Sequence, residues 1–168
     1  CDEHHGSDDM RDAFTGSVTA EVSADQTQVD VQMSRPMAKF NFISTDLQDF
    51  VARVKMNASN PTKSVEVGDY KVIFRYNGFM PCAYNQHTSK PTDSATGVFF
   101  ESSITQLNDA EAEMGFDYVF TNGSETVVSV SVEVYDLDGK MLSRSKAFDV
   151  PLMRSKLTTV KARFLTSD

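Results

Sequence analysis

The sequence is built largely from short runs in which apolar and polar residues alternate, and this pattern limits the fold more than any other feature. The clearest run spans residues 126–135, where Val128, Val130, Val132 and Val134 fall on one side of an extended chain. Residues two apart share a face of a β-strand, whereas an amphipathic helix needs apolar residues three and four apart. The run therefore predicts a strand with one buried face.

The same alternation recurs along most of the chain, with turn signals between the runs. Asn77-Gly78, Asn122-Gly123 and Asp138-Gly139 are dipeptides typical of tight turns. The predicted strands cover residues 15–24, 29–33, 37–43, 70–76, 98–104, 117–121, 126–135, 140–150 and 157–165, with 78–84 as the hairpin partner of 70–76. Short strands at this spacing predict a mostly β fold, an antiparallel β-sandwich of two sheets.

One segment has the helical period instead. Its apolar residues lie at positions i, i+3, i+4 and i+7, which are Leu47, Phe50, Val51 and Val54. Thr45 and Gln48 have the spacing of a capping box at a helix start. We therefore expect one short helix near residues 46–55, and we expect the polar residues 85–97 to form a long exposed loop.

The length and the net charge limit the number of domains and the kinds of partner that the protein can have. The 168 residues fit one domain, which typically holds about 100–200 residues. The net charge of −8 argues against nucleic acid as a partner, because phosphate contacts need clustered Lys and Arg. Five acidic residues and one basic residue lie in the first twelve. We interpret residues 1–13 as a flexible acidic leader and residues 14–168 as a single domain.

The first residue suggests how the protein is held in place. Bacterial lipoproteins are cut immediately before a Cys that is then acylated, and Cys1 followed by a polar leader fits that position. A trimmed sequence would look the same, so this alternative stays open. The second cysteine, Cys82, lies among apolar and aromatic residues and is expected to be a buried structural thiol.

Motifs for catalysis or for a cofactor are absent from the sequence. It has no phosphate-binding loop, no G-x-S-x-G turn and no pair of cysteines at zinc spacing. His4 and His5 stand beside acidic residues that could bind a metal, but a flexible leader fixes no geometry for one. We therefore expect no enzyme, no metal site and no cofactor.

Aromatic residues gather in one part of the chain and are the remaining candidates for a ligand surface. Tyr76, Phe79 and Tyr84 lie close together in the sequence, and stacked rings of this kind bind sugars. The chain has no Trp, and packing in the core is the commoner use of such residues. Both interpretations stay open.

Three segments resemble strands of fimbrillin-like surface lipoproteins. Residues 150–166 are similar to the closing V-P-x-x-R-N and T-x-V/I-x-G-x-F/L-L-T pattern of that family, with Ser155 in place of the usual Asn and Ala162 in place of the usual Gly. Residues 35–39 resemble the early R-x-x-A-K strand, and residues 117–120 the D-x-V-F strand. The resemblance spans most of the chain and rests on strand patterns.

The resemblance implies a transthyretin-like, Greek-key sandwich and a non-catalytic lipoprotein anchored through Cys1 and exposed on the cell outer membrane. It implies a role as an accessory or anchor subunit or in cell adhesion, with pilus subunits or host or bacterial surface ligands as partners. Asp93-Ser94-Ala95 matches a D-S/T-A acceptor for O-glycosylation, used by some bacteria that carry this family, and makes Ser94 a candidate for a glycan; an ordinary Asp-Ser in a loop is the alternative. The alternative function is a glycan-binding lipoprotein of a nutrient-uptake system, which would use the aromatic residues.

Overall fold

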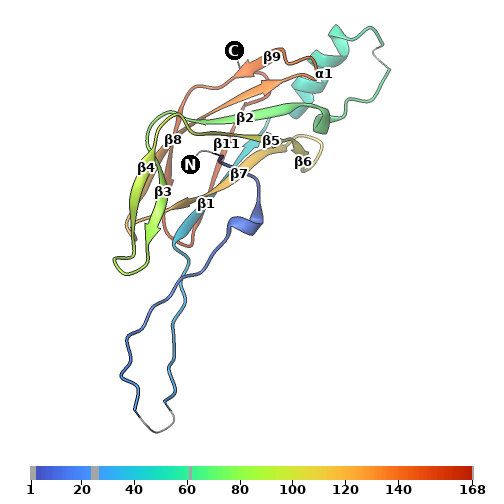
Figure 1. The fold of residues 1–168 in the computed structure, drawn as a ribbon. Coiled ribbons are helices and arrows are strands. Elements are labelled where there is room, and N and C mark those ends of the chain that lie inside the picture. Colours follow the sequence, from blue (N-terminus) through green and yellow to red (C-terminus); the bar gives the residue numbers. More distant parts are fainter. Residues whose placement is uncertain (1–2, 24–26, 61, 168) are drawn as a thin grey trace.

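Two β-sheets packed face to face form the body of the protein (Figure 1), as the alternating runs predict. The structure is a computed structural model that describes residues 3–23, 27–60 and 62–167. The first sheet has the order β11 (Leu157–Ala162), β1 (Met37–Ser44), β7 (Ala112–Phe120), β6 (Thr105–Gln106). The second has the order β10 (Phe148–Leu152), β8 (Thr126–Tyr135), β2 (Lys71–Tyr76), β5 (Phe99–Ser103), and β9 (Met141–Arg144) also pairs with β8. Strands β1 and β11 run parallel, and the other pairs in the two sheets are antiparallel.

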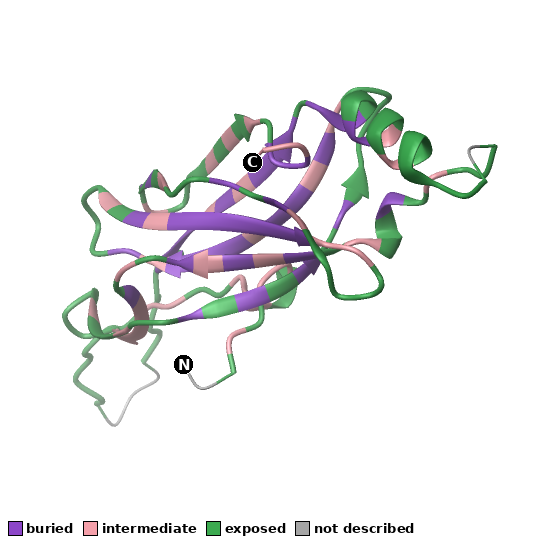
Figure 2. Ribbon diagram, turned by 90° about the horizontal axis from the view of Figure 1, so that it is seen from above, coloured by how far each residue is buried: buried purple, intermediate pink, exposed green. Residues whose placement is uncertain are grey.

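The core lies between the sheets and is rich in phenylalanine. Figure 2 shows how buried and exposed residues alternate along the strands. Phe42 of β1 meets Phe74 of β2 with ring centroids 5.4 Å apart, and Phe74 stacks on Phe100 of β5 at 4.8 Å. The four valines Val128, Val130, Val132 and Val134 are all buried on this inner face. The period-two pattern therefore identified the core side of β8 correctly.

The single helix is confirmed, but the way it begins differs from the prediction. Helix α1 (Leu47–Asn57) buries Leu47 and Phe50, and its N-cap is Asp46 rather than Thr45. The Asp46 carboxylate makes no capping bond. It accepts hydrogen bonds from the backbone N–H and the hydroxyl of Thr166 at 2.9 and 2.6 Å. The Leu47 N–H, a first-turn donor of the helix, donates to the Ala110 carbonyl at 3.3 Å, so a tertiary contact satisfies it in place of a side-chain cap.

The strands predicted at 15–24 and 29–33 are wrong. In the described part of this segment, the only strand-like pairing is a bridge between Thr15 and Ser34, with two backbone hydrogen bonds of 2.8 Å. We call residues 15–23 and 27–34 the arm; they project from one end of the sandwich as two extended limbs (Figure 1). Alternation alone makes a strand only where a neighbouring edge accepts its backbone hydrogen bonds, and the arm lies beyond the sheets.

The predicted hairpin of 70–76 with 78–84 and the loop at 85–97 are also wrong. β2 has β5 on one side and β8 on the other, so neither edge is left for residues 78–84. These residues contribute instead to β3 (Met80–Asn85), which pairs with β4 (Lys90–Ala95) in a separate hairpin. Two short 3₁₀ turns, η1 (Asp9–Arg11) and η2 (Val67–Asp69), complete the fold.

Replacing Phe40 with Ala should lower the free energy of unfolding by about 3–5 kcal/mol, because the ring is fully buried and its loss leaves a cavity. Chemical denaturation measures the change. Val127→Ala on the outer face of β8 is the control, and it should change stability by less than about 0.5 kcal/mol. A loss below about 1 kcal/mol for Phe40→Ala would contradict the assignment of faces.

Candidate functional site

The N-terminal segment, residues 3–12, lies against the open side of the sandwich, which differs from the flexible leader predicted. Strand β6 pairs only with the first two residues of β7, so the rest of that edge is free of β6. The segment takes this place: the Ser7 N–H donates to the Phe116 carbonyl at 2.7 Å, and the Phe116 N–H donates to the Ser7 hydroxyl at 3.2 Å. The two hydroxyls of Ser7 and Ser102 lie 2.7 Å apart and join the segment to β5.

A buried carboxylate explains why the segment docks. Asp117 of β7 is 1% exposed, and the Tyr76 hydroxyl donates to its Oδ2 at 2.6 Å. His4 Nε2 lies 2.5 Å from Oδ2, and Arg11 Nη1 lies 2.5 Å from Oδ1. A carboxylate out of water is costly unless it is paired and hydrogen-bonded. The N-terminal segment therefore supplies the positive charge that the sandwich needs at this point.

Tyr76 keeps its proton in this cluster. Burial raises the pKa of the Tyr76 hydroxyl well above its ordinary value, and the charge of Asp117 raises that pKa further. The hydroxyl is therefore a permanent donor to the carboxylate.

A glycine lets the segment approach the core closely. A Cβ on Gly6 would lie 2.2 Å from a ring carbon of Phe100, which is buried in the core of β5. The His4 ring packs beside the same phenylalanine, with centroids 5.7 Å apart. The contact leaves no room for any side chain at position 6.

A second ion pair holds the segment at η1. Lys39 Nζ lies 2.8 Å from Asp9 Oδ1 and 3.9 Å from the centre of the Phe116 ring. The Tyr118 hydroxyl also donates to Asp9, at 2.7 Å. The hydrogen bonds from Lys39 and Tyr118 lower the pKa of the Asp9 carboxyl. The Asp9 side chain is mostly exposed, so this pair orients the segment more than it stabilises it.

The sequence held a signal for the buried carboxylate that the prediction did not use. Asp117 is two residues from Val119 and four from Thr121, and both are completely buried. A charged residue in phase with the buried positions of a strand needs a partner. Where that partner lies, more than a hundred residues away at His4 and Arg11, is a matter of tertiary structure.

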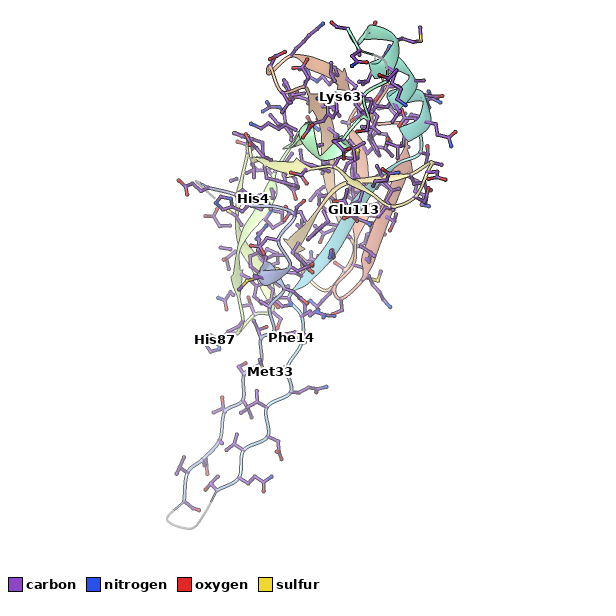
Figure 3. The ribbon with its side chains drawn as sticks, turned by 90° about the vertical axis from the view of Figure 1, so that its right-hand side faces the viewer. His4, Phe14, Met33, Lys63, His87 and Glu113 are labelled. Carbon is purple, nitrogen blue, oxygen red and sulfur yellow. The ribbon has the colours of Figure 1, made fainter. Side chains whose placement is uncertain are left out.

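The arm carries several exposed large apolar side chains. Its large apolar side chains are between 45% and 85% exposed: Val18, Val22, Val29, Val31 and Met33. Two carboxylates, Glu21 and Asp30, are exposed among them. Figure 3 shows Phe14 and Met33 at the base, where the limbs leave the sandwich. The base is held by Arg35, which donates to both oxygens of Asp12 at 3.0 and 3.1 Å and lies over the Phe14 ring.

The structure does not gather the predicted ligand surface. Tyr76 is 4% exposed and belongs to the Asp117 cluster, so its ring offers no open face. Tyr84 of β3 stacks on Phe120 with centroids 5.5 Å apart, whereas Phe79 is 72% exposed before β3 begins. Of these three rings, only that of Phe79 is exposed. Because Tyr76 is buried, these rings do not form the sugar-binding surface that the sequence suggested.

Ser94 and Cys82, two other residues singled out in the sequence, both lie on the β3–β4 hairpin. Cys1 lies outside the described residues. Ser94 is exposed, but on strand β4 instead of a loop, opposite Pro81 of β3. Cys82 is partly exposed and not buried as predicted, because the β3–β4 hairpin stands outside the two sheets.

The described residues contain neither a cluster of metal ligands nor a membrane-spanning helix. Within residues 3–23, 27–60 and 62–167, no three His, Cys, Asp or Glu side chains come together as a metal site. The helices of the same residues are all too short or too polar to cross a bilayer.

The fold and its surfaces define a β-sandwich with a projecting arm, closed on one side by its own N-terminal segment. The chain belongs to a family of unknown function, DUF6562, whose model matches residues 1–168. No curated protein matches it.

Tyr76→Phe should lower the free energy of unfolding by about 1–3 kcal/mol, because the buried Asp117 loses a donor that no solvent replaces. Thermal or chemical unfolding measures the loss. Tyr84→Phe removes a hydroxyl outside the cluster and should be close to neutral. Equal effects of the two substitutions would show that the hydrogen bond from Tyr76 to Asp117 contributes nothing to stability.

Gly6→Ala should release the N-terminal segment, because the new methyl group would overlap the Phe100 ring. Hydrogen exchange at Ser7, whose N–H is bonded to β7, should speed up while the exchange of the core strands stays slow. Gly68→Ala is the matched control, since nothing lies within 4 Å of a Cβ there. Unchanged exchange at Ser7 would contradict the docked position.

Proposed function

We propose that the protein is a non-catalytic, fimbrillin-like surface lipoprotein that is anchored in the outer membrane through Cys1 and acts in adhesion or as an accessory or anchor subunit. The observation that carries the proposal is the arm. Exposed patches of large apolar side chains mark sites of protein interaction, because burying them against a partner removes them from water. Here they are gathered on a projection that adds nothing to the core of the sandwich.

The three motifs that resemble the fimbrillin-like family also support the proposal. Residues 35–39 lead into β1, residues 117–120 lie in β7, and the closing motif includes β11. These are neighbouring strands of the first sheet, in the order β11, β1, β7. The resemblance therefore concerns one continuous piece of structure, although a shared fold alone does not specify function.

Replacing residues 16–33 with a short Gly-Ser linker should abolish adhesion or partner capture by cells of the native host while the protein still reaches the surface. The two limbs join at the Thr15–Ser34 bridge, so the linker leaves the sandwich closed. Cell-binding assays and labelling of surface protein measure the two effects. Shortening the β3–β4 turn at residues 86–89 is the control and should leave adhesion unchanged.

The anchor is tested separately. Cys1→Ser should release the protein from the membrane fraction and prevent incorporation of a labelled fatty acid. Normal adhesion by cells that carry the linker variant would contradict the role of the arm. A fatty acid still attached to the Cys1→Ser variant would contradict the anchor at Cys1.

A further inference from the structure

We propose that the protein lies on the lipid surface with one edge of the sandwich nearest the membrane, so that the arm extends along the surface instead of away from it. We call this edge the docked edge: strands β5 and β7 together with residues 4–7, which join them. The inference rests on the anchor at Cys1 in the proposed function, and it names the side of the anchored protein that faces the lipid.

The position of His4 limits the length of the tether to the anchor. His4 Nε2 lies 2.5 Å from Asp117 Oδ2, and 6% of the His4 side chain is exposed. The His4 ring also packs beside Tyr76, with centroids 6.0 Å apart. Cys1 and Asp2 lie outside the described residues, but covalent geometry limits their reach. Three Cα–Cα steps separate Cys1 from His4, and a fully extended chain covers at most about 3.6 Å per step, or about 11 Å in all.

A flexible leader would give the body much more freedom. If residues 1–13 were free, as the sequence predicted, the body could move more than about 40 Å from the anchor. Docking removes most of this length, because Ser7 is hydrogen-bonded to β7 and lies against β5, and Gly6 lies against the Phe100 ring. The body is therefore held close to the lipid by a short tether.

The tether leaves the docked edge near the middle of β7. Asp117, which holds His4, has five residues of β7 before it and three after it. A strand rises about 3.3 Å per residue, so the edge extends roughly 16 Å to one side of this point and roughly 10 Å to the other. These lengths are comparable with the reach of the tether. A tilt of the body soon brings one end of the edge against the lipid, so the docked edge stays the nearest side.

The strand order shows which side of the sandwich then faces outward. In the first sheet β7 is followed by β1 and β11, and in the second sheet β5 is followed by β2, β8 and β10. Neighbouring strands lie about 4.8 Å apart, so β11 and β10 lie roughly 10–15 Å farther from the lipid than the docked edge does. The edge formed by β10 and β11 is therefore the outer side of the anchored protein.

The same orientation sets the direction of the arm. The arm ends at Ser34, β1 begins at Met37, and Figure 1 shows the arm continuing beyond the ends of the strands. Figure 3 shows His4 on one flank of the body, whereas Phe14 and Met33 lie at the end from which the arm leaves. When that flank faces the lipid, the strands and the arm run along the surface. The partner that the arm reaches is then a protein on the same membrane.

The tether, and not attraction to the lipid, holds the docked edge in place. Charged side chains of its two strands are paired within the protein: Glu101 of β5 with Lys71, and Asp117 of β7 with Arg11. The edge therefore needs no charged lipid. A neutral phosphatidylcholine bilayer is the appropriate surface for a test.

Energy transfer from the full chain to labelled lipids tests the orientation. The Cys1 thiol is coupled to a maleimide lipid in the bilayer, in a Cys82→Ser background because Cys82 is partly exposed. A fluorescent amino acid replaces Phe99 of β5 or Leu157 of β11, which are 49% and 57% exposed. Transfer to an acceptor dye on the lipid headgroups should be several-fold stronger from position 99. Equal transfer, or stronger transfer from position 157, would overturn the inference.

Two variants test whether the docked tether causes the difference. A flexible Gly-Ser insert between Glu3 and His4 keeps the docked contacts and lengthens the tether, so it should abolish the difference between the two probes. Gly6→Ala should reduce the difference by releasing the segment, whereas Gly68→Ala should leave it unchanged. A difference that survives the insert would show that the tether does not set the orientation.

The direction of the arm has its own measurement. Probes at Val31 on the arm and at Met56 on α1, two exposed positions at opposite ends of the molecule, should transfer energy to a similar extent. A body that stood on one end would give several-fold stronger transfer from one of the two positions. That result would overturn the placement of the arm along the surface.

The chemical anchor makes the outcome separable from the proposed function. Equal transfer from positions 99 and 157, in a protein whose Cys1 does incorporate fatty acid in the native host, overturns the orientation and leaves the anchor standing. A Cys1 that incorporates no fatty acid in the host overturns the natural anchor, whatever the probes on the maleimide lipid show.

Discussion

The Asp117 carboxylate is the point on which the two sheets and the N-terminal segment depend together. It lies on β7 of the first sheet, accepts from Tyr76 on β2 of the second, and faces His4 and Arg11 of the segment. A buried carboxylate with one partner removed is far more costly than an apolar residue of the same size. If the segment dissociated, the buried Asp117 carboxylate would lose the partners that the segment provides. The segment therefore stays on the sandwich, where it also covers the edge of β7.

The closed side of the sandwich contrasts with the arm that follows it in the chain. Residues 3–12 bring polar groups to a sheet edge that lacks partners, whereas residues 15–23 and 27–34 carry apolar groups away from the core. Both segments are extended, and the difference between them lies in whether an edge is available. An open sheet edge and an exposed apolar segment can each bind another molecule. In this protein the sheet edge is covered by residues 3–12, whereas the apolar side chains of the arm stay exposed.

Exposed apolar side chains on a projecting arm are consistent with a protein that acts by binding other molecules. The arm and α1 lie at opposite ends of the sandwich, so a contact at the arm leaves the other end free (Figure 1). A sandwich suits this arrangement because its rigid core fixes the distance and direction between the two ends. The lipid anchor proposed at Cys1 and the adhesive role proposed for the arm would act from the same rigid body.

The sequence by itself determined the β-sandwich, the single helix and the inner face of β8, because these depend on local periodicity and on turns between neighbours. Only the tertiary structure decided three other features: the strand pairing of residues 78–95, the extended arm, and the docking of residues 3–12 on Asp117. In each, the outcome depends on which sheet edges are already occupied and on charges that lie far apart in the sequence. β2 was already paired on both sides, the arm lay beyond every edge, and the Asp117 carboxylate needed His4 and Arg11. The alternation of apolar and polar residues indicates which face of a strand is buried, but it does not indicate which neighbouring strand will accept its hydrogen bonds.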